Sequence, residues 1–594
     1  SPFGVRNVKV YWNNIPVTDP GGNTYFNQFA ANSFSYAEIF KGPVSSMYGA
    51  GSGGLILLNT RFDTLSHLNA EFNAGSFKTK NFLLDGNFTG SNYYSRISMI
   101  FKKGDGYREQ TQSEKTSLTW STNLRLNDKN ELSASVLFTD MYYQTPGALT
   151  LKEFQENPHA ARPQAGVFPS ASDAKAAIFQ RTFLTGFTYR NQLNQSLEHT
   201  TTIYGSFAQV KNPAIRNYES RSEPHFGGRT VLTLNQELGH QKSLQWSSGI
   251  EFQQGDFNIM VSKNKGGNPD TLMTNDEVKT MLYSLFTQAV FSIDQNWFFT
   301  AGVSYNKSRL EFSRLTSYPV RKQLFSYKNE MAPRVSVLKK INDFSILASI
   351  SKGFSPPTVA ELLPSTGIIN TDLEAEHGWN YELTARQSFL KGMLNFEATG
   401  FYFNLNNALV LQRDAAGADY FSNAGKIHQK GLELTANYVY LPVRKQVFDY
   451  LLINTSYAFS HFRYGSYVKE KNDYSGKIVP SIPTHSVSLW SDILLVNGLY
   501  FKPSYYYASK IYLNDANTAA ANPYHLLGLS VGYKKQFQKL KLKLYVGADN
   551  LLDERYSLGN DINASGGRFY NAAPGKNYFA GVAIGISKNN YAKK

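Results

Sequence analysis

From about residue 67 to the end of the chain, polar and apolar residues alternate along segments of about ten to sixteen residues. Clear examples are Glu71–Ala74, Tyr94–Phe101, Glu131–Phe138 and Phe396–Tyr402. Successive side chains of a β-strand point to opposite faces, so a period of two predicts strands with one polar and one apolar face. The segment lengths fit strands that cross a lipid bilayer at a tilt.

The connections between these segments alternate between short and long. The short ones include 126–130, 191–195, 239–242, 294–295, 339–343, 390–392 and 495–498. The long polar ones are about 143–177, 211–229, 256–277, 312–328, 353–377, 406–426, 463–482, 509–523 and 550–576. Bacterial outer-membrane barrels have short turns at one end and long loops at the other, so the pattern predicts an all-β transmembrane, antiparallel β-barrel of about 22 strands over residues 67–594.

Residues 1–66 predict a small separate β-domain. Val8–Trp12 is an expected strand, Asn13-Asn14 an expected turn, and Ile15–Gly22 an extended segment that ends in Asp-Pro-Gly-Gly. Two more expected strands, at 37–40 and 55–60, flank a stretch with five glycines. Glycine suits backbone that packs closely or takes positive φ, although a tight turn in any small β-domain would explain the same pattern.

Composition supports a membrane barrel. Aromatic residues make up 14% of the chain, and no run of about 18 apolar residues could form a transmembrane helix. Cysteine is absent, which excludes disulfides and thiolate metal sites. The net charge of +15 comes from lysine and arginine scattered through every loop. This scatter favours anionic lipid headgroups or an anionic ligand as partners, and disfavours nucleic acid.

No enzyme motif is present. The chain has neither a GxSxG elbow, nor an HExxH pair, nor an EF-hand pattern. Its ten histidines are dispersed, mostly in or beside expected loops, and each is expected to be a solvated or hydrogen-bonded residue. The sequence therefore predicts a non-enzymatic protein with no cofactor and no metal site.

The segment 34–61 runs from an expected strand through Lys41-Gly42-Pro43 and Tyr48-Gly49 to the glycine pair 53–54 and a second expected strand. It resembles the end of the plug domain of TonB-dependent outer-membrane receptors, in which Arg-Gly-Pro is usual in place of Lys-Gly-Pro. Barrel segments that resemble the family are 351–362, 380–383, 430–434, 550–556 and 574–581. The wording FGVR at 3–6, TDPGG at 18–22 and TPGALT at 145–150 resembles the subgroup that takes up ferric citrate or pyrroloquinoline quinone.

This resemblance implies the second half of a plug at residues 1–66 and a barrel at 67–594 in the bacterial outer membrane. It implies TonB-dependent transport of a small anionic compound or iron chelate, of the siderophore, ferric citrate or quinone-cofactor type. The expected partners are TonB, through an N-terminal box with no counterpart here, a small-molecule ligand, and outer-membrane lipid and lipopolysaccharide. A lipoprotein or another outer-membrane protein is a further possible partner.

The expected substrate contacts fall on three segments. On the plug they are Asp19, Gly21, Gly22, Asn23, Thr24 and Tyr25, where exposed glycines would permit close approach, although a purely structural loop tip fits equally. On the barrel they are Tyr142, Tyr143, Arg162, Arg216, Arg221, His225 and Arg229, because guanidinium groups suit carboxylates. Salt bridges to Glu219 and Glu223 are the alternative for these arginines. The resemblance also implies that Lys41, Glu382 and Glu433 dock the plug.

Other functions remain open. The chain could receive a different nutrient, such as cobalamin, haem, a short glycan or a peptide. It could also be a scaffold or subunit of a larger outer-membrane assembly. A porin is a weaker alternative, which the plug-like segment at the N-terminus opposes.

Overall fold

The computed structural model describes residues 7–43, 46–49, 51–363, 369–370, 372–413, 419–444, 446–469 and 471–587. The FGVR motif at 3–6 lies outside these residues, as do positions 44, 45 and 50 of the glycine-rich stretch. Among the described residues, no helix is long and apolar enough to cross a membrane.

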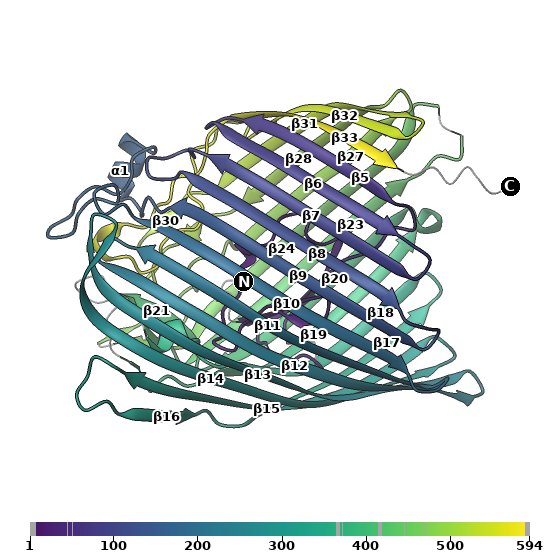
Figure 1. Cartoon of the computed structure of the whole chain (residues 1–594), viewed down its shortest axis with the longest axis horizontal. Helices are drawn as coiled ribbons and strands as arrows, with labels where there is room; N and C mark the ends of the chain where they lie inside the picture. Colours follow the sequence, from purple (N-terminus) through teal and green to yellow (C-terminus); the bar gives the residue numbers. More distant parts are fainter. Residues whose placement is uncertain are drawn as a thin grey trace.

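A closed antiparallel barrel of 22 strands dominates the structure, and its first strand pairs with its last (Figure 1). The strands of the first half are β5 (His67–Gly75), β6 (Thr79–Thr89), β7 (Tyr93–Gly104), β8 (Ser113–Arg125), β9 (Asn130–Gln144), β10 (Ala177–Gln192), β11 (Leu197–Pro213), β12 (Asn217–Gly239), β13 (Lys242–Lys265), β14 (Asn268–Ile293) and β15 (Trp297–Arg314). Those of the second half are β17 (Glu330–Ile341), β18 (Phe344–Ser355), β19 (Glu376–Phe389), β20 (Leu394–Asn406), β23 (Lys426–Tyr440), β24 (Phe448–Ser466), β27 (His485–Leu495), β28 (Leu499–Ala508), β31 (Tyr524–Phe537), β32 (Leu540–Asp549) and β33 (Asn577–Ser587). The predicted fold class and strand number are confirmed.

The barrel wall is uneven in height. β14 has 26 residues, whereas β5 has nine. The predicted long loops at 211–229 and 256–277 are wrong, because β11 to β14 continue through them and turn tightly at 214–216 and 266–267. These strand ends look like loops in the sequence because, beyond the apolar band, both faces of a strand meet water and the alternation disappears.

The remaining outer connections carry short elements that fold over the mouth. They are α1 (Leu151–Glu156), β16 (Lys322–Ser326), α2 (Val359–Leu362), the hairpins β21 (Leu409–Arg413) with β22 (Asp419–Asn423), β25 (Val468–Lys469) with β26 (Asn472–Asp473), and β29 (Ile511–Tyr512) with β30 (Ala520–Ala521). Single turns of 3-10 helix lie at Phe26–Gln28, Leu390–Gly392 and Ser565–Gly567.

A buried carboxylate ties four of these outer segments together. Asp515 accepts hydrogen bonds from the hydroxyl of Tyr464 (2.7 Å), the hydroxyl of Tyr467 (3.2 Å) and Nδ2 of Asn563 (3.1 Å). Gln412 Nε2, on β21, donates to the same carboxylate at 3.3 Å. Because a buried charge is costly unless it is hydrogen-bonded, these contacts make the connections after β20, β24, β28 and β32 interdependent.

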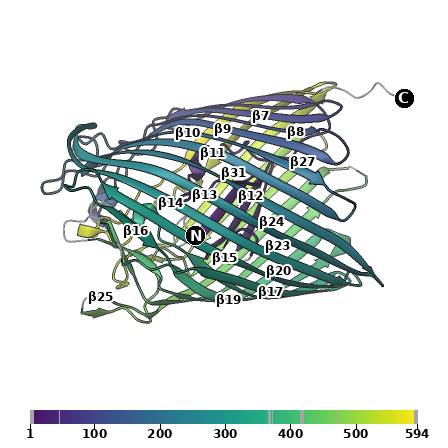
Figure 2. The same ribbon diagram turned by 60° about the horizontal axis from the view of Figure 1, so that its bottom comes forward.

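A small mixed sheet, here called the lumenal sheet, lies inside the barrel (Figures 1 and 2). Its strands are β1 (Val8–Trp12), β2 (Ile15–Pro16), β3 (Tyr36–Lys41) and β4 (Gly54–Asn59), in the order β2-β1-β4-β3. The strands predicted for this region are confirmed. At Gly54, φ is +136° and an added Cβ would lie 2.2 Å from the carbonyl oxygen of Phe40, so only glycine fits there.

An apolar cluster joins the lumenal sheet to the barrel wall. Trp12 and Ile15 are fully buried in the same cluster as Leu137 of β9, Leu184 of β10 and Tyr204 of β11. The alternation of β1 and β2 thus serves a core that is shared between the sheet and the wall.

We expect Trp12→Ala to weaken the docking of the lumenal sheet by about 3–5 kcal/mol, because it removes a fully buried indole and leaves a cavity. Chemical denaturation followed by trypsin cleavage within residues 7–66 measures this. Trp246, which is 49% exposed, provides the control variant Trp246→Ala. Equal protease resistance of the two variants would contradict the shared core.

Candidate functional site

The segment 19–25 of the N-terminal region is a preorganised loop. The backbone N–H of Asp19 donates to the carbonyl of Asn23, and the N–H of Asn23 donates to Oδ1 of Asp19, both at 2.9 Å. The hydroxyls of Thr18 and Thr24 lie 2.8 Å apart, and Gly22 takes φ +89°. The predicted turn is therefore present and is fixed by its own polar groups.

The barrel covers this loop. An added Cβ on Gly21 would lie 2.6 Å from the ring of Phe257, and one on Gly22 would lie 2.8 Å from the side chain of Thr358. The N–H of Val359, which begins α2, donates to the carbonyl of Gly21 at 3.1 Å. The expectation that these glycines are exposed is wrong for Gly21, which is buried. The missing side chains of Gly21 and Gly22 allow the loop to pack closely against the wall.

Little free space remains beside the loop. A cavity of about 30 Å³ borders Gly21 and Gly22, and one of about 50 Å³ lies between Lys9 and Glu251. Each volume holds only a few water molecules. A chelate would therefore need this region to rearrange.

Arg221 lies on β12 among three acidic groups. Its guanidinium is 2.9 Å from Glu219 and 3.5 Å from Glu223, the two carboxylates that the sequence offered as alternatives to substrate. The hydroxyl of Tyr25 donates to Glu223 at 3.1 Å. The structure thus brings Tyr25 and Arg221, both partly buried, together with the buried carboxylates of Asp19 and Glu223 at the boundary between loop and wall.

Arg229, which lies further along the same strand β12, forms a second group that is buried. Its Nη1 donates to Glu251 at 2.8 Å, and the hydroxyl of Tyr11 donates to the same carboxylate at 3.0 Å. The guanidinium also lies 4.5 Å from the ring of Tyr48 and 4.3 Å from that of Phe286. Both guanidiniums are therefore engaged by carboxylates of the wall, and Arg229 joins the wall to the lumenal sheet.

Sequence reasoning missed Glu251, Tyr11 and Lys9 as site residues. Burial lowers the pKa of Lys9, while Glu251 and Asp19 oppose this shift. A signal did exist, because Glu251 is a charged residue at an inward position in the middle of a strand. Only the register between β12 and β13, which places Arg229 opposite Glu251, shows what it neutralises.

The remaining predicted contacts lie at different places. Tyr142 packs on Phe179 on the outer wall, with ring centroids 4.7 Å apart, so Tyr143 of the same strand points inward. His225 is buried, with its ring 6.0 Å from that of Tyr204. At the outer corner, Arg162 borders Gly147, and the guanidinium of Arg216 lies 4.2 Å over the ring of Phe168.

The three expected docking residues lie on the far side of the lumenal sheet. Lys41 forms an ion pair with Glu433 of β23. Glu382 of β19 interacts electrostatically with both Glu433 and Arg334, a partner that the sequence did not indicate. The Lys41 side chain is 66% exposed, so this pair is a solvated contact and weaker than the Arg229 group.

Asp19 makes the attachment of the loop depend on pH. Burial, and then the neighbouring Glu223, raise the pKa of Asp19 to about 7, although Arg221 and two backbone N–H groups oppose the shift. The folded state then binds a proton that the unfolded state releases, so stability falls as pH rises from about 4 to about 7. We expect Asp19→Asn to remove this loss, and to make the loop more protease-resistant than wild type at pH 8 but not at pH 4.5. An unchanged pH profile would contradict this assignment.

We expect Arg229→Ala to cost about 3–5 kcal/mol of docking free energy, because it leaves Glu251 buried without its cation. The double variant Arg229→Met with Glu251→Gln should recover most of this loss, since no charge remains. Arg181→Ala, which breaks an exposed pair with Asp140, should cost less than about 1 kcal/mol. The denaturation and cleavage assay measures all three, and equal effects of Arg229→Ala and Arg181→Ala would refute the buried pair.

Known proteins share this architecture. A sequence model of the family described as TonB dependent receptor-like, beta-barrel matches residues 11–551. The structure is similar to that of the ferric citrate transporter FecA in its unliganded form, with a TM-score of 0.82 and 17% identity over 98% of this chain and 89% of the other.

Two further solved structures are also similar. The siderophore receptor PiuA from Acinetobacter baumannii has a TM-score of 0.78 and 16% identity over 98% of this chain and 89% of its own. The copper transporter OprC has a TM-score of 0.76 and 14% identity over 98% and 91%. At these identities the similarity shows a common fold.

The sequence match covers most of the chain, from the end of β1 through the barrel strands to the loop after β32. Receptors of this kind interact with TonB and bind small ligands. The chain belongs to the TonB-dependent receptor-like β-barrel family and is a protein of the bacterial outer membrane.

Proposed function

We propose that this protein is a TonB-dependent transporter that takes up a small anionic iron chelate, of the ferric citrate or siderophore type, without a catalytic step. The observation that carries this proposal is the family match over residues 11–551, together with similarity along nearly the whole chain to structures named for ferric citrate and siderophores. The ferric citrate type agrees with the motifs at 18–22 and 145–150.

The arrangement of charges supports the turn between β11 and β12, beside the connection that follows β9, as the first contact for an anion. Arg221 and Arg229 are already held by carboxylates. Arg216, at the tip of the β11–β12 hairpin, forms no ion pair with any carboxylate in the described ranges, and its guanidinium lies 4.2 Å over the ring of Phe168. Gly147 borders both Arg162 and Ile215, which places Arg162 in the same corner. The guanidinium of Arg216 at this position suits a carboxylate-rich chelate.

We further propose that the lumenal sheet and its loops, up to residue 66, are the second half of a plug that closes the barrel. A barrel of 22 strands is wide enough to leak unless something fills it. Ligand can open such a gate only by binding the open and closed states differently. For the gate to open, the hydrogen bonds and ion pairs around Arg221 and Arg229 must break or find new partners. TonB would supply the energy for this rearrangement.

We expect ferric citrate to bind the purified full chain in isothermal titration, and Arg216→Ala to weaken binding about tenfold or more, because it removes a charge-assisted contact. Arg125→Ala is the control, since it removes one exposed guanidinium from the last residue of β8, where it pairs with the exposed Asp128 far from the mouth. Uptake of radiolabelled iron by cells that carry each variant should follow the same order.

Two outcomes would contradict the proposal. If Arg216→Ala and Arg125→Ala bind ferric citrate equally, the corner at Arg216 is not the contact. If wild type binds neither ferric citrate nor pyrroloquinoline quinone and a partner protein co-purifies with it, the substrate class is wrong and a scaffold role is favoured.

A further inference from the structure

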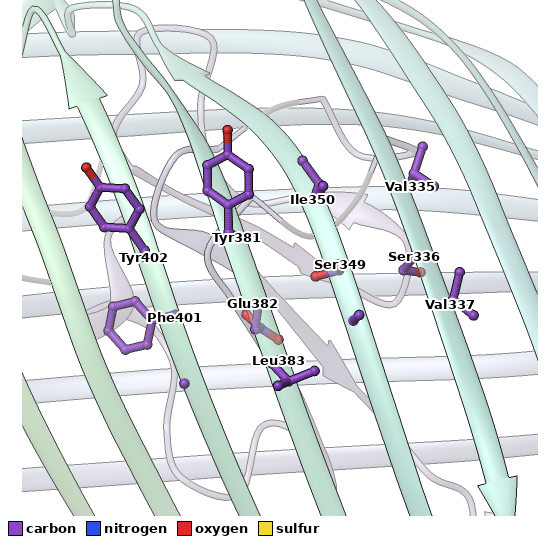
Figure 3. A pocket seen from close by; sticks show the side chains of 12 residues that line it. Val335, Ser336, Val337, Ser349, Ile350, Tyr381, Glu382, Leu383, Phe401 and Tyr402 are labelled. Atoms are coloured by element: carbon purple, nitrogen blue, oxygen red, sulfur yellow. The ribbon is translucent and has the colours of Figure 1, made fainter.

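The outer wall of the barrel has an apolar groove across β17 to β20. It has a volume of about 500 Å³ and is lined by Val335, Val337, Ala348, Ile350, Tyr381, Leu383, Gly400 and Tyr402, with further residues of the same strands behind them. Figure 3 shows the rings of Tyr381 and Tyr402 side by side, with both hydroxyls pointing the same way along the wall. Ala348 and Gly400 leave the hollow, because an added Cβ on Gly400 would meet nothing within 4 Å.

A cationic cluster adjoins the outer end of this groove. Lys430 of β23 pairs in register with Tyr402, and its ammonium lies 5.5 Å from the Tyr402 ring. His428, two residues nearer the mouth, has its Nδ1 3.0 Å from the Tyr402 hydroxyl. On β24, His461 is opposite Lys430 and Arg463 is opposite His428, and Arg463 Nε donates to His461 Nε2 at 3.1 Å.

These side chains point away from the lumen. Their neighbours along the strands, Ile427, Gln429, Phe462 and Tyr464, are buried on the inner face, so the alternating positions face outward. Two more histidines extend the same face. His485 Nδ1 lies 2.9 Å from the hydroxyl of Tyr457, and His525 Nδ1 lies 2.7 Å from that of Tyr505. These four histidines stand in strands, three of them within three residues of a strand's first residue, beside the loops as expected, and His461 further inside β24.

Among the described strands beside the cluster, no carboxylate stands at an outward position at the level of the cluster. The outward positions from residue 377 to 383, 400 to 406, 426 to 432 and 457 to 463 hold no Asp or Glu. Two other cations on the outer wall, in contrast, each pair with a carboxylate, as Lys103 does with Glu114 at 3.1 Å and Arg181 does with Asp140. Within the described ranges, Lys430 has no such partner. An uncompensated cation cluster beside an apolar groove is complementary to an anionic amphiphile.

We propose that this face binds one phosphorylated lipid of the outer leaflet, with an acyl chain in the groove and a phosphate on Lys430 and Arg463. Tyr402 fixes the orientation of His428, and Arg463 fixes that of His461 by donating to its Nε2. The ring nitrogens that remain, Nε2 of His428 and Nδ1 of His461, can present N–H donors to the other phosphate oxygens. A phosphate offers several acceptors to several donors at once, which a single surface lysine could not match. The apolar floor selects a lipid over a free anion, because burial of methylene groups adds to the electrostatic attraction.

Native mass spectrometry of the full chain in detergent tests this with hexa-acylated bis-phosphorylated lipid A as the probe. We expect Lys430→Ala with Arg463→Ala to lower its affinity at least about tenfold. The matched control, Lys103→Ala with Arg181→Ala, removes the same charge from paired sites and should change affinity less than about twofold. Gly400→Leu would fill the groove and should also weaken lipid binding. If Gly400→Leu does not fold, Ala348→Leu fills the same groove and replaces it in the test.

Two further probes separate the sources of binding. Inorganic phosphate at the same concentration should not displace the lipid, and the same acylated disaccharide without phosphate should bind at least about tenfold more weakly. Equal binding of the phosphate-free lipid, or equal effects of the two double variants, would show ordinary lipid contact and overturn the proposal. Displacement by inorganic phosphate would overturn the role of the groove.

Discussion

The closure of the β-ladder is the constraint on which the rest of this structure depends. In hydrocarbon every backbone N–H and C=O must find its partner within the protein, and pairing β33 with β5 leaves no open edge. Closure with 22 strands creates a lumen wider than the side chains of the wall can fill. The lumenal sheet occupies part of that space. The polar side chains of the inner wall must therefore provide hydrogen-bond and ion-pair partners for the sheet and its loops.

The barrel was predictable from sequence because alternation and turn spacing are local signals. The outer rim was less so, since β12 to β14 continue past the apolar band into water, where the period of two no longer separates polar from apolar residues. The site was predictable only in part. Arginines on β12 could be found by their chemistry, but their partners come from other strands, and Glu251 opposite Arg229 is visible only in the register.

Pairing decides what each cation can do. Arg221 and Arg229 form ion pairs with carboxylates of the wall, and these pairs help to hold the lumenal region to the wall. Arg216 on the mouth and Lys430 on the outer wall have no partner among the described carboxylates, and they remain able to attract anions from outside. A net charge of +15 alone does not distinguish these cases.

The uneven height of the wall gives the mouth two mechanically different halves. β13 and β14 pair residue by residue almost to their turn at 266–267, so that flank is a stiff hairpin. The opposite flank consists of separate connections, which are joined by hydrogen bonds to Asp515 and by buried apolar side chains such as Val410 and Val479. An arriving solute therefore meets a continuous β-hairpin on one flank and cross-linked loops on the other.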